Sequence, residues 1–247
     1  AAEPRFLRAL GILKTALEDS DSSVANSLMG LGLQYLNQGN YSAAEPLFLR
    51  ALEIRKTALG ESHPGVAMSL NNLAGLYHSQ GNYSAAEPLF RRALDIRETA
   101  LGESHPDVAT SLNNLALLYQ DQGNYNAAEP LLHRSLEIRE ATLGESHPDV
   151  AASLNNLAAL YSSQGNYNAA EPLYRRSLEI LETALGESHP SVATSLNNLA
   201  ELYRNQGNYN AAEPLYRRSL EIRETALGES HPSVATSLNN LANLYSS

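Results

Sequence analysis

The chain contains no cysteine among its 247 residues, so disulfide bonds and thiol chemistry are excluded. It also lacks any apolar run that approaches the length of a membrane span, and no signal peptide opens it. Basic residues are few: 17 Lys and Arg stand against 27 Asp and Glu, which gives a formal net charge of −10. Because nucleic-acid binding needs clustered Lys and Arg, this charge argues against a nucleic-acid partner. We expect a cytoplasmic protein that binds neither nucleic acid nor membrane.

Proline is restricted to two short motifs, His-Pro and Ala-Glu-Pro, and both recur at a fixed period. The His-Pro prolines lie 42 positions apart, at Pro64, Pro106, Pro148, Pro190 and Pro232. A fixed period in this range is typical of a solenoid, in which one supersecondary unit stacks on copies of itself. A solenoid offers a long surface rather than an enclosed pocket, so the period bears directly on function.

Each repeat contains two helical patterns. In the repeat that starts at Pro64, a first apolar stripe with helical spacing comprises Leu70, Leu73, Ala74 and Tyr77. After Gln80-Gly81-Asn82, a second stripe comprises Ala86, Leu89, Phe90, Ala93 and Leu94. Gly102 suits the left-handed position that ends a helix, and Pro106 suits the first turn of the next one. No window alternates as a strand would, so the sequence predicts twelve helices, alternately a first helix and a second helix.

The period divides the chain into a single array over residues 1–247. We expect a half repeat at 1–21 that holds only a second helix, and a half repeat at 232–247 that holds only a first helix. Between them lie five full repeats, at 22–63, 64–105, 106–147, 148–189 and 190–231. Because every internal repeat packs a second helix on the next first helix, the unpaired terminal helices could support head-to-tail self-association.

Several residues at fixed spacing form a known family pattern. They are a Leu, a small residue and a Tyr in the first helix, a turn Gly, and Ala, an aromatic residue and Ala in the second helix: Leu73, Ala74, Tyr77, Gly81, Ala86, Phe90 and Ala93. This pattern resembles the tetratricopeptide repeat. The 42-residue period, the LNNLAxLY core and the LGxxHPxVA linker resemble the repeats of kinesin light chains and their bacterial relatives. The resemblance implies an all-α, right-handed superhelical solenoid of antiparallel helix pairs, whose first helices line a concave groove.

The resemblance also implies that the groove binds protein segments and that the protein is not an enzyme. The candidate binding residues are pairs of asparagines in the middle of the first helices: Asn71 and Asn72, Asn113 and Asn114, Asn155 and Asn156, Asn197 and Asn198, and Asn239 and Asn240. Asparagine in a helix interior costs roughly 0.7 kcal/mol relative to alanine, and neither position belongs to the apolar stripe. Both are therefore predicted to face the groove or its wall.

A primary amide has one acceptor and two donors, so it can pair with the backbone of an extended peptide. In the resembled family the second asparagine of each pair contacts bound peptide. The resemblance assigns that role here to Asn72, Asn114, Asn156, Asn198 and Asn240. Two other interpretations stay open, because the repeats are nearly identical copies: the asparagines could form a soluble inner face, or they could hydrogen-bond each other between repeats.

The groove positions that vary between copies are candidates for ligand specificity, although variation on an exposed face also arises by drift. Glu201 and Arg204 are the charged residues in these columns, where other copies carry residues such as Gly75 or His78. In the first copy, Met29-Gly30 replaces the asparagine pair, so the groove is predicted to differ there.

No metal, cofactor or catalytic set is predicted. Histidines one repeat apart should be separated by about 10 Å, the spacing of packed helices, whereas zinc binds nitrogen at about 2.0–2.1 Å. The His-Pro histidines are therefore assigned to the linker and the helix start. His78 and His133 lie outside this series and are predicted to be isolated and exposed. No Ser-His-Asp set or carboxylate pair stands out.

The sequence therefore favours a scaffold that binds an extended peptide segment of a partner protein in the concave groove. The alternatives are a structural spacer or self-assembling solenoid array, and a sensor array of a larger signalling protein.

Overall fold

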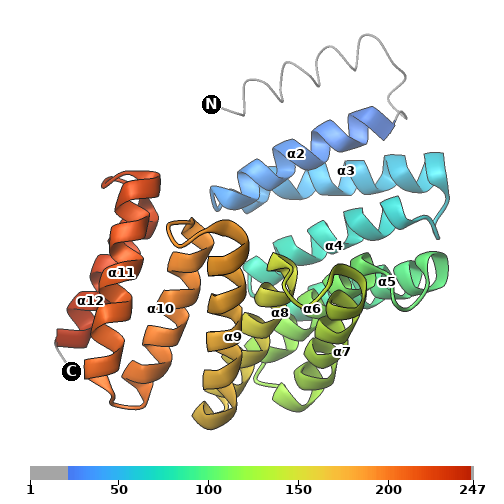
Figure 1. Ribbon diagram of the computed structural model, residues 1–247. Helices are drawn as coiled ribbons and strands as arrows, with labels where there is room; N and C mark the ends of the chain where they lie inside the picture. Colours follow the sequence, from blue (N-terminus) through green and yellow to red (C-terminus); the bar gives the residue numbers. More distant parts are fainter. Residues whose placement is uncertain (1–21, 246–247) are drawn as a thin grey trace. The chain divides into compact units, whose positions relative to one another are not determined.

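The computed structural model describes residues 22–245, which fold into eleven α-helices and no strand (Figure 1). The first helices are α2 (Ser22–Asn37), α4 (Pro64–Ser79), α6 (Pro106–Asp121), α8 (Pro148–Ser163), α10 (Pro190–Asn205) and α12 (Pro232–Tyr245). The second helices are α3 (Tyr41–Leu59), α5 (Tyr83–Leu101), α7 (Tyr125–Leu143), α9 (Tyr167–Leu185) and α11 (Tyr209–Leu227). The all-α prediction is confirmed for this part of the chain. The twelfth predicted helix, within residues 1–21, lies outside the described residues.

The chain divides into two compact units. Unit 1 contains the described residues up to Asn124, with helices α2 to α6, and unit 2 starts at Tyr125 and contains α7 to α12. Within each unit every helix packs on the next one along the chain (Figure 1). First helices of neighbouring repeats also touch, α2 with α4 and α4 with α6 in unit 1, and α8 with α10 in unit 2. The predicted stacking of helix pairs is thus present in each unit.

Both helix types start on a side-chain cap. The Nδ1 atom of His63 accepts a hydrogen bond from the Gly65 N–H at 3.0 Å, and Pro64 occupies the first turn of α4. The Oδ1 atom of Asn82 accepts one from the Ala85 N–H at 3.3 Å at the start of α5. These bonds satisfy backbone donors that a helix start leaves unpaired. The helix-start role predicted for the His-Pro histidines is confirmed.

The second helices end on glycines with positive φ. Gly102, which follows α5, has φ 88° and ψ 152°. The positive φ was predicted, but the prediction of a left-handed helical conformation is wrong, because ψ is extended. This region of backbone space is essentially open only to glycine. It takes the chain out of the helix into a turn at Glu103 and Ser104, which leads to the extended backbone of His105.

The predicted apolar stripes form the core. Leu70, Leu73 and Ala74 of α4 are buried, as are Ala86 and Phe90 of α5. In α6, Leu115, Ala116 and Tyr119 are buried, whereas Asn114 stays partly exposed. The face assigned to the core from helical spacing is therefore correct.

In α4, α6, α8, α10 and α12, a tyrosine near the end of the first helix bonds to the second helix of the preceding repeat. Tyr77 donates a hydrogen bond to Glu45 at 2.8 Å, and Tyr203 donates one to Glu171 at 2.7 Å. The same bond recurs at Tyr119–Glu87, Tyr161–Glu129 and Tyr245–Glu213. Because this bond recurs at the same repeat position in the described residues, it holds each of these first helices in the same register on the preceding second helix.

Candidate functional site

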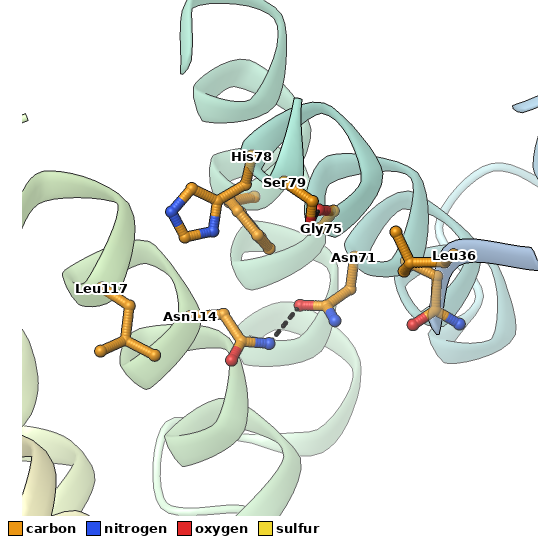
Figure 2. Close-up of a pocket in the computed structure, with 9 residues that line it drawn as sticks. Leu36, Asn71, Gly75, His78, Ser79, Asn114 and Leu117 are labelled. Carbon is orange, nitrogen blue, oxygen red and sulfur yellow. Dashed lines mark hydrogen bonds between the residues drawn. The ribbon is translucent and has the colours of Figure 1, made fainter. Parts of the chain in front are cut away.

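A hollow in unit 1, here called the unit 1 hollow, lies on the first helices and has a volume of about 230 Å³. Its lining residues are Leu36, Asn71, Asn72, Gly75, His78, Ser79, Phe90, Asn114 and Leu117 (Figure 2). All of them except Phe90 belong to α2, α4 or α6. The unit 1 hollow is therefore formed mainly by first helices.

Two predicted asparagines meet in the unit 1 hollow. The Nδ2 atom of Asn114 donates a hydrogen bond to Oδ1 of Asn71 at 2.9 Å, drawn as the dashed line in Figure 2. The equivalent bond joins Asn240 to Asn197 at 2.8 Å in unit 2. Hydrogen bonding between repeats, one of the interpretations left open by the sequence, is therefore present. Asn72 differs, since its amide forms no hydrogen bond with another described residue.

A second hollow, the unit 2 hollow, has a volume of about 400 Å³. Its lining residues are Pro148, Asp149, Ala152, Asn155, Asn156, Leu181, Leu185, Ser191, Thr194 and Asn198, from α8, α9 and α10. Asn155 donates to Oγ of Ser177 at 2.5 Å, while its Oδ1 is buried and has no hydrogen-bond partner. The amide of Asn198 forms no hydrogen bond with another described residue. This hollow thus offers an unpaired acceptor and an unpaired amide.

The remaining predicted residues have mixed environments. Asn113 is buried, with 8% of its surface exposed, whereas Asn239 is exposed. Arg204 donates a hydrogen bond to Glu201, so the two predicted charges on α10 compensate each other. Tyr216 of α11 also donates to Glu201, at 2.6 Å. Burial and, second to it, this hydrogen bond raise the pKa of the Tyr216 phenol.

A family model described as tetratricopeptide repeat matches residues 23–99 and 101–183, and a second model with that description matches residues 192–233. The chain belongs to the tetratricopeptide repeat family. This fold generally serves as a protein–protein interaction scaffold, and the family is generally non-enzymatic. A comparison with curated protein sequences finds no match.

Solved structures support the kinesin light chain-like resemblance of this tetratricopeptide array. BtubC (BKLC) from P. vanneervenii is 26% identical with a TM-score of 0.74, and the match covers 92% of this chain and 94% of that one. A putative kinesin light chain from Podosopora anserina with nearly identical TPR-like repeats is 28% identical with a TM-score of 0.67, covering 84% of this chain and 98% of that one. The predicted resemblance is confirmed.

The predictions for the two isolated histidines of the array need correction. His78 is half-buried in the unit 1 hollow, with Nε2 2.6 Å from Oδ2 of Asp121 and the ring against Tyr83 and Phe90. His133 is exposed as predicted, but its Nε2 lies 3.0 Å from the Tyr161 hydroxyl. Both predictions of isolation are wrong because stacking places residues of neighbouring repeats side by side.

A column of arginines at one repeat position was not predicted from the sequence; Arg55, Arg97 and Arg223 are buried, and Arg139 is partly exposed. Arg55, Arg97, Arg139 and Arg223 occupy one repeat position and donate hydrogen bonds to the following first helix. In the fourth copy this position is Leu181, which lines the unit 2 hollow. Alignment of the five full repeats carries the signal, since Leu181 is the one apolar residue at a position where the other four full repeats have arginine.

Among residues 22–245, none of the tetratricopeptide helices is long and apolar enough to cross a membrane. Within the same range, no three His, Asp or Glu side chains are grouped so that they could hold a metal ion.

Proposed function

We propose that this tetratricopeptide array binds an extended segment of a partner protein along its first helices, through asparagine amides and without a chemical step. One observation carries the proposal. Each hollow holds a second asparagine of a pair, Asn72 or Asn198, whose amide forms no hydrogen bond with another described residue. An unpaired amide can bind a ligand without first breaking a bond within the protein.

The chemistry of these amides suits a peptide backbone. A carboxamide carries one acceptor oxygen and two N–H donors, the same groups that an extended chain presents along its edge. Neighbouring helices pack about 8–10 Å apart, and an extended chain rises about 3.3 Å per residue. Successive repeats would thus meet every third ligand residue. Asn114 also fits this role, since its bond to Asn71 uses only one of its two N–H donors.

Side-chain selectivity would come from the residues that differ between copies. Leu117 in the unit 1 hollow offers an apolar contact, and Gly75 beside it leaves space for a ligand side chain. In unit 2, Glu201 and Arg204 offer both signs of charge as a pair. A ligand residue that contacts this pair would be polar rather than strongly charged, because either charge would compete with the partner already present.

A peptide-display selection tests the proposal. Affinities of selected peptides would be measured by calorimetry for the wild type and for the triple variant Asn72→Ala, Asn114→Ala and Asn198→Ala. Loss of three neutral hydrogen bonds, each contributing about 0.5–1.5 kcal/mol, should weaken binding by more than about tenfold. The control is Asn168→Ala, an exposed residue at the start of α9 where the second repeat carries Ser84. Equal affinity in the triple variant and the control would place the site elsewhere.

The asparagine bonds between repeats favour a second candidate function, a purely structural array. If Asn114–Asn71 and Asn240–Asn197 serve only to stack repeats, then display should yield no peptide that depends on Asn72 or Asn198. Head-to-tail self-association would accompany such a role. It involves a helix predicted within residues 1–21, which lie outside the described residues, so it stays a prediction, and light scattering across a concentration series tests it.

A further inference from the structure

In four of the five full repeats, an arginine joins the second helix to the next first helix; Arg55, Arg97 and Arg223 are buried, and Arg139 is partly exposed. Arg97 of α5 donates from Nη1 to Oγ of Ser111 at 2.7 Å and to the carbonyl oxygen of Asp107 at 3.1 Å. Both acceptors lie in the first turns of α6. The same two bonds are made by Arg55, Arg139 and Arg223. The position between a second helix and the next first helix is therefore a guanidinium site, built from one serine hydroxyl and one backbone carbonyl.

The fourth copy has the acceptors without the arginine. Leu181 takes its place on α9, and the corresponding acceptors on α10 are Ser195 and the carbonyl of Ser191. Ser195 is fully buried and its Oγ has no hydrogen-bond partner. A buried hydroxyl without a hydrogen-bond partner costs free energy. The fourth repeat therefore keeps the acceptor of this hydrogen bond but lacks the donor.

The position without an arginine borders the unit 2 hollow. Leu181 and Ser191 line that hollow, as does Ala152, which occupies the repeat position where Asn26 accepts from Arg55 in the first copy. The hollow has a volume of about 400 Å³, within the range of small-molecule and side-chain sites. Its wall adds the buried, unpartnered Oδ1 of Asn155 and the carboxylate-bearing Asp149. Polar acceptors and a carboxylate thus line the hollow that borders Leu181, the residue at the position of the arginine in the other full repeats.

We infer that the unit 2 hollow binds an arginine side chain of the partner segment, whose guanidinium takes the place of the missing internal one. This inference deepens the proposed function and rests on it, since the arginine is supplied by the bound segment. The planar guanidinium has five donors in a fixed fork, which suits several separate acceptors better than the single ammonium of lysine. The apolar walls Leu181 and Leu185 would hold the methylene stem. The net charge of −10 favours a cationic ligand over an acidic one.

A single-residue probe tests the site without knowledge of the partner. Nα-acetyl-arginine N-methylamide would be titrated into the whole protein while the methyl resonances of Leu181 and Leu185 are followed by NMR. The lysine and citrulline analogues are the matched probes: binding should weaken with lysine and disappear with neutral citrulline. Equal shifts with all three compounds would overturn the inference, and so would shifts with free arginine but none with the blocked derivative.

Two variants complete the test. Leu181→Arg restores the residue found at the other four copies, so it should fold normally, fill the site from within and abolish the arginine-dependent shifts at Leu185. Ser195→Ala removes one acceptor and should weaken binding by about tenfold, the factor expected for a lost charge-assisted hydrogen bond. Leu181→Met adds no guanidinium and should bind as the wild type does. Unchanged binding in Leu181→Arg would overturn the inference.

The two proposals fail separately. If displayed peptides bind through the asparagines but the arginine probe does not bind, then only the arginine site is refuted. If the probe binds and no displayed peptide depends on the asparagines, then the segment-binding role is refuted, and with it the source of the arginine.

Discussion

Two serines at the same repeat position should respond oppositely to replacement by alanine. Ser111 accepts a hydrogen bond from Arg97, whose side chain is buried with 7% of the residue exposed. Burial lowers the pKa of the Arg97 guanidinium, so the charged form depends on the acceptors around it. Ser111→Ala removes one of them. Ser195 has no partner to lose.

The magnitudes follow from these contacts. A hydrogen bond to a charged group contributes about 1.5–3 kcal/mol. Alanine is the better helix former by up to about 0.7 kcal/mol, which offsets part of the loss. Ser111→Ala should therefore destabilise unit 1 by about 1–2.5 kcal/mol. Ser195→Ala gains the helix propensity and removes an unpaired buried hydroxyl, so unit 2 should be unchanged or stabilised by up to about 2 kcal/mol.

Native-state hydrogen exchange is the suitable assay, because stability in a repeat array is local and global unfolding need not be two-state. Exchange of the amides in α6 should accelerate in Ser111→Ala, whereas exchange of the amides in α10 should be unchanged or slower in Ser195→Ala. Urea midpoints at constant m would give an independent check. Equal acceleration in both variants would show that the Ser195 hydroxyl has a partner, and the inference from its missing donor would fail.

Two further predictions concern the core and pH. Ala116 of α6 is fully buried, so Ala116→Leu should overpack the helix contact and lower the free energy of unfolding by roughly 1–3 kcal/mol; an unchanged thermal midpoint would contradict the assigned core face. Hydrogen bonds from Arg91 first, and then from Tyr119, lower the pKa of the Glu87 carboxyl below its ordinary value. The stability that this carboxylate contributes is present above its unfolded pKa of about 4.3 and is lost as pH falls through the folded pKa. Glu87→Gln should therefore reduce the loss of thermal stability between about pH 5 and 3. An unchanged pH dependence would contradict the stabilising role assigned to Glu87.

Helices and their boundaries were predictable because residues at each helix end act as local start and stop signals. His63 and Pro64 start a first helix, Asn82 starts a second helix, and both act within a few residues of their own position. Contacts between repeats were harder to predict. The bond from His78 to Asp121 spans 43 residues, and it depends on the stacking register rather than on any local pattern. The asparagine prediction had the same weakness, since helical spacing placed Asn71 and Asn114 on one surface but could not show that they bond each other.

Because the repeats are nearly identical in sequence, contacts at the same position in different repeats can be compared directly. Where a contact recurs, as Tyr77–Glu45 and Tyr203–Glu171 do, its energy is part of stacking and cannot by itself distinguish one ligand from another. Ligand preference must then come from positions where a copy departs from the others. Leu181 differs from the arginine of the other full repeats and leaves the buried hydroxyl of Ser195 without a hydrogen-bond partner, which costs folding free energy. No other residue in the described part of the chain replaces the missing donor. A local rule broken without internal compensation is expected at functional sites, and here the missing donor has the geometry and charge of a side chain that a bound segment can supply.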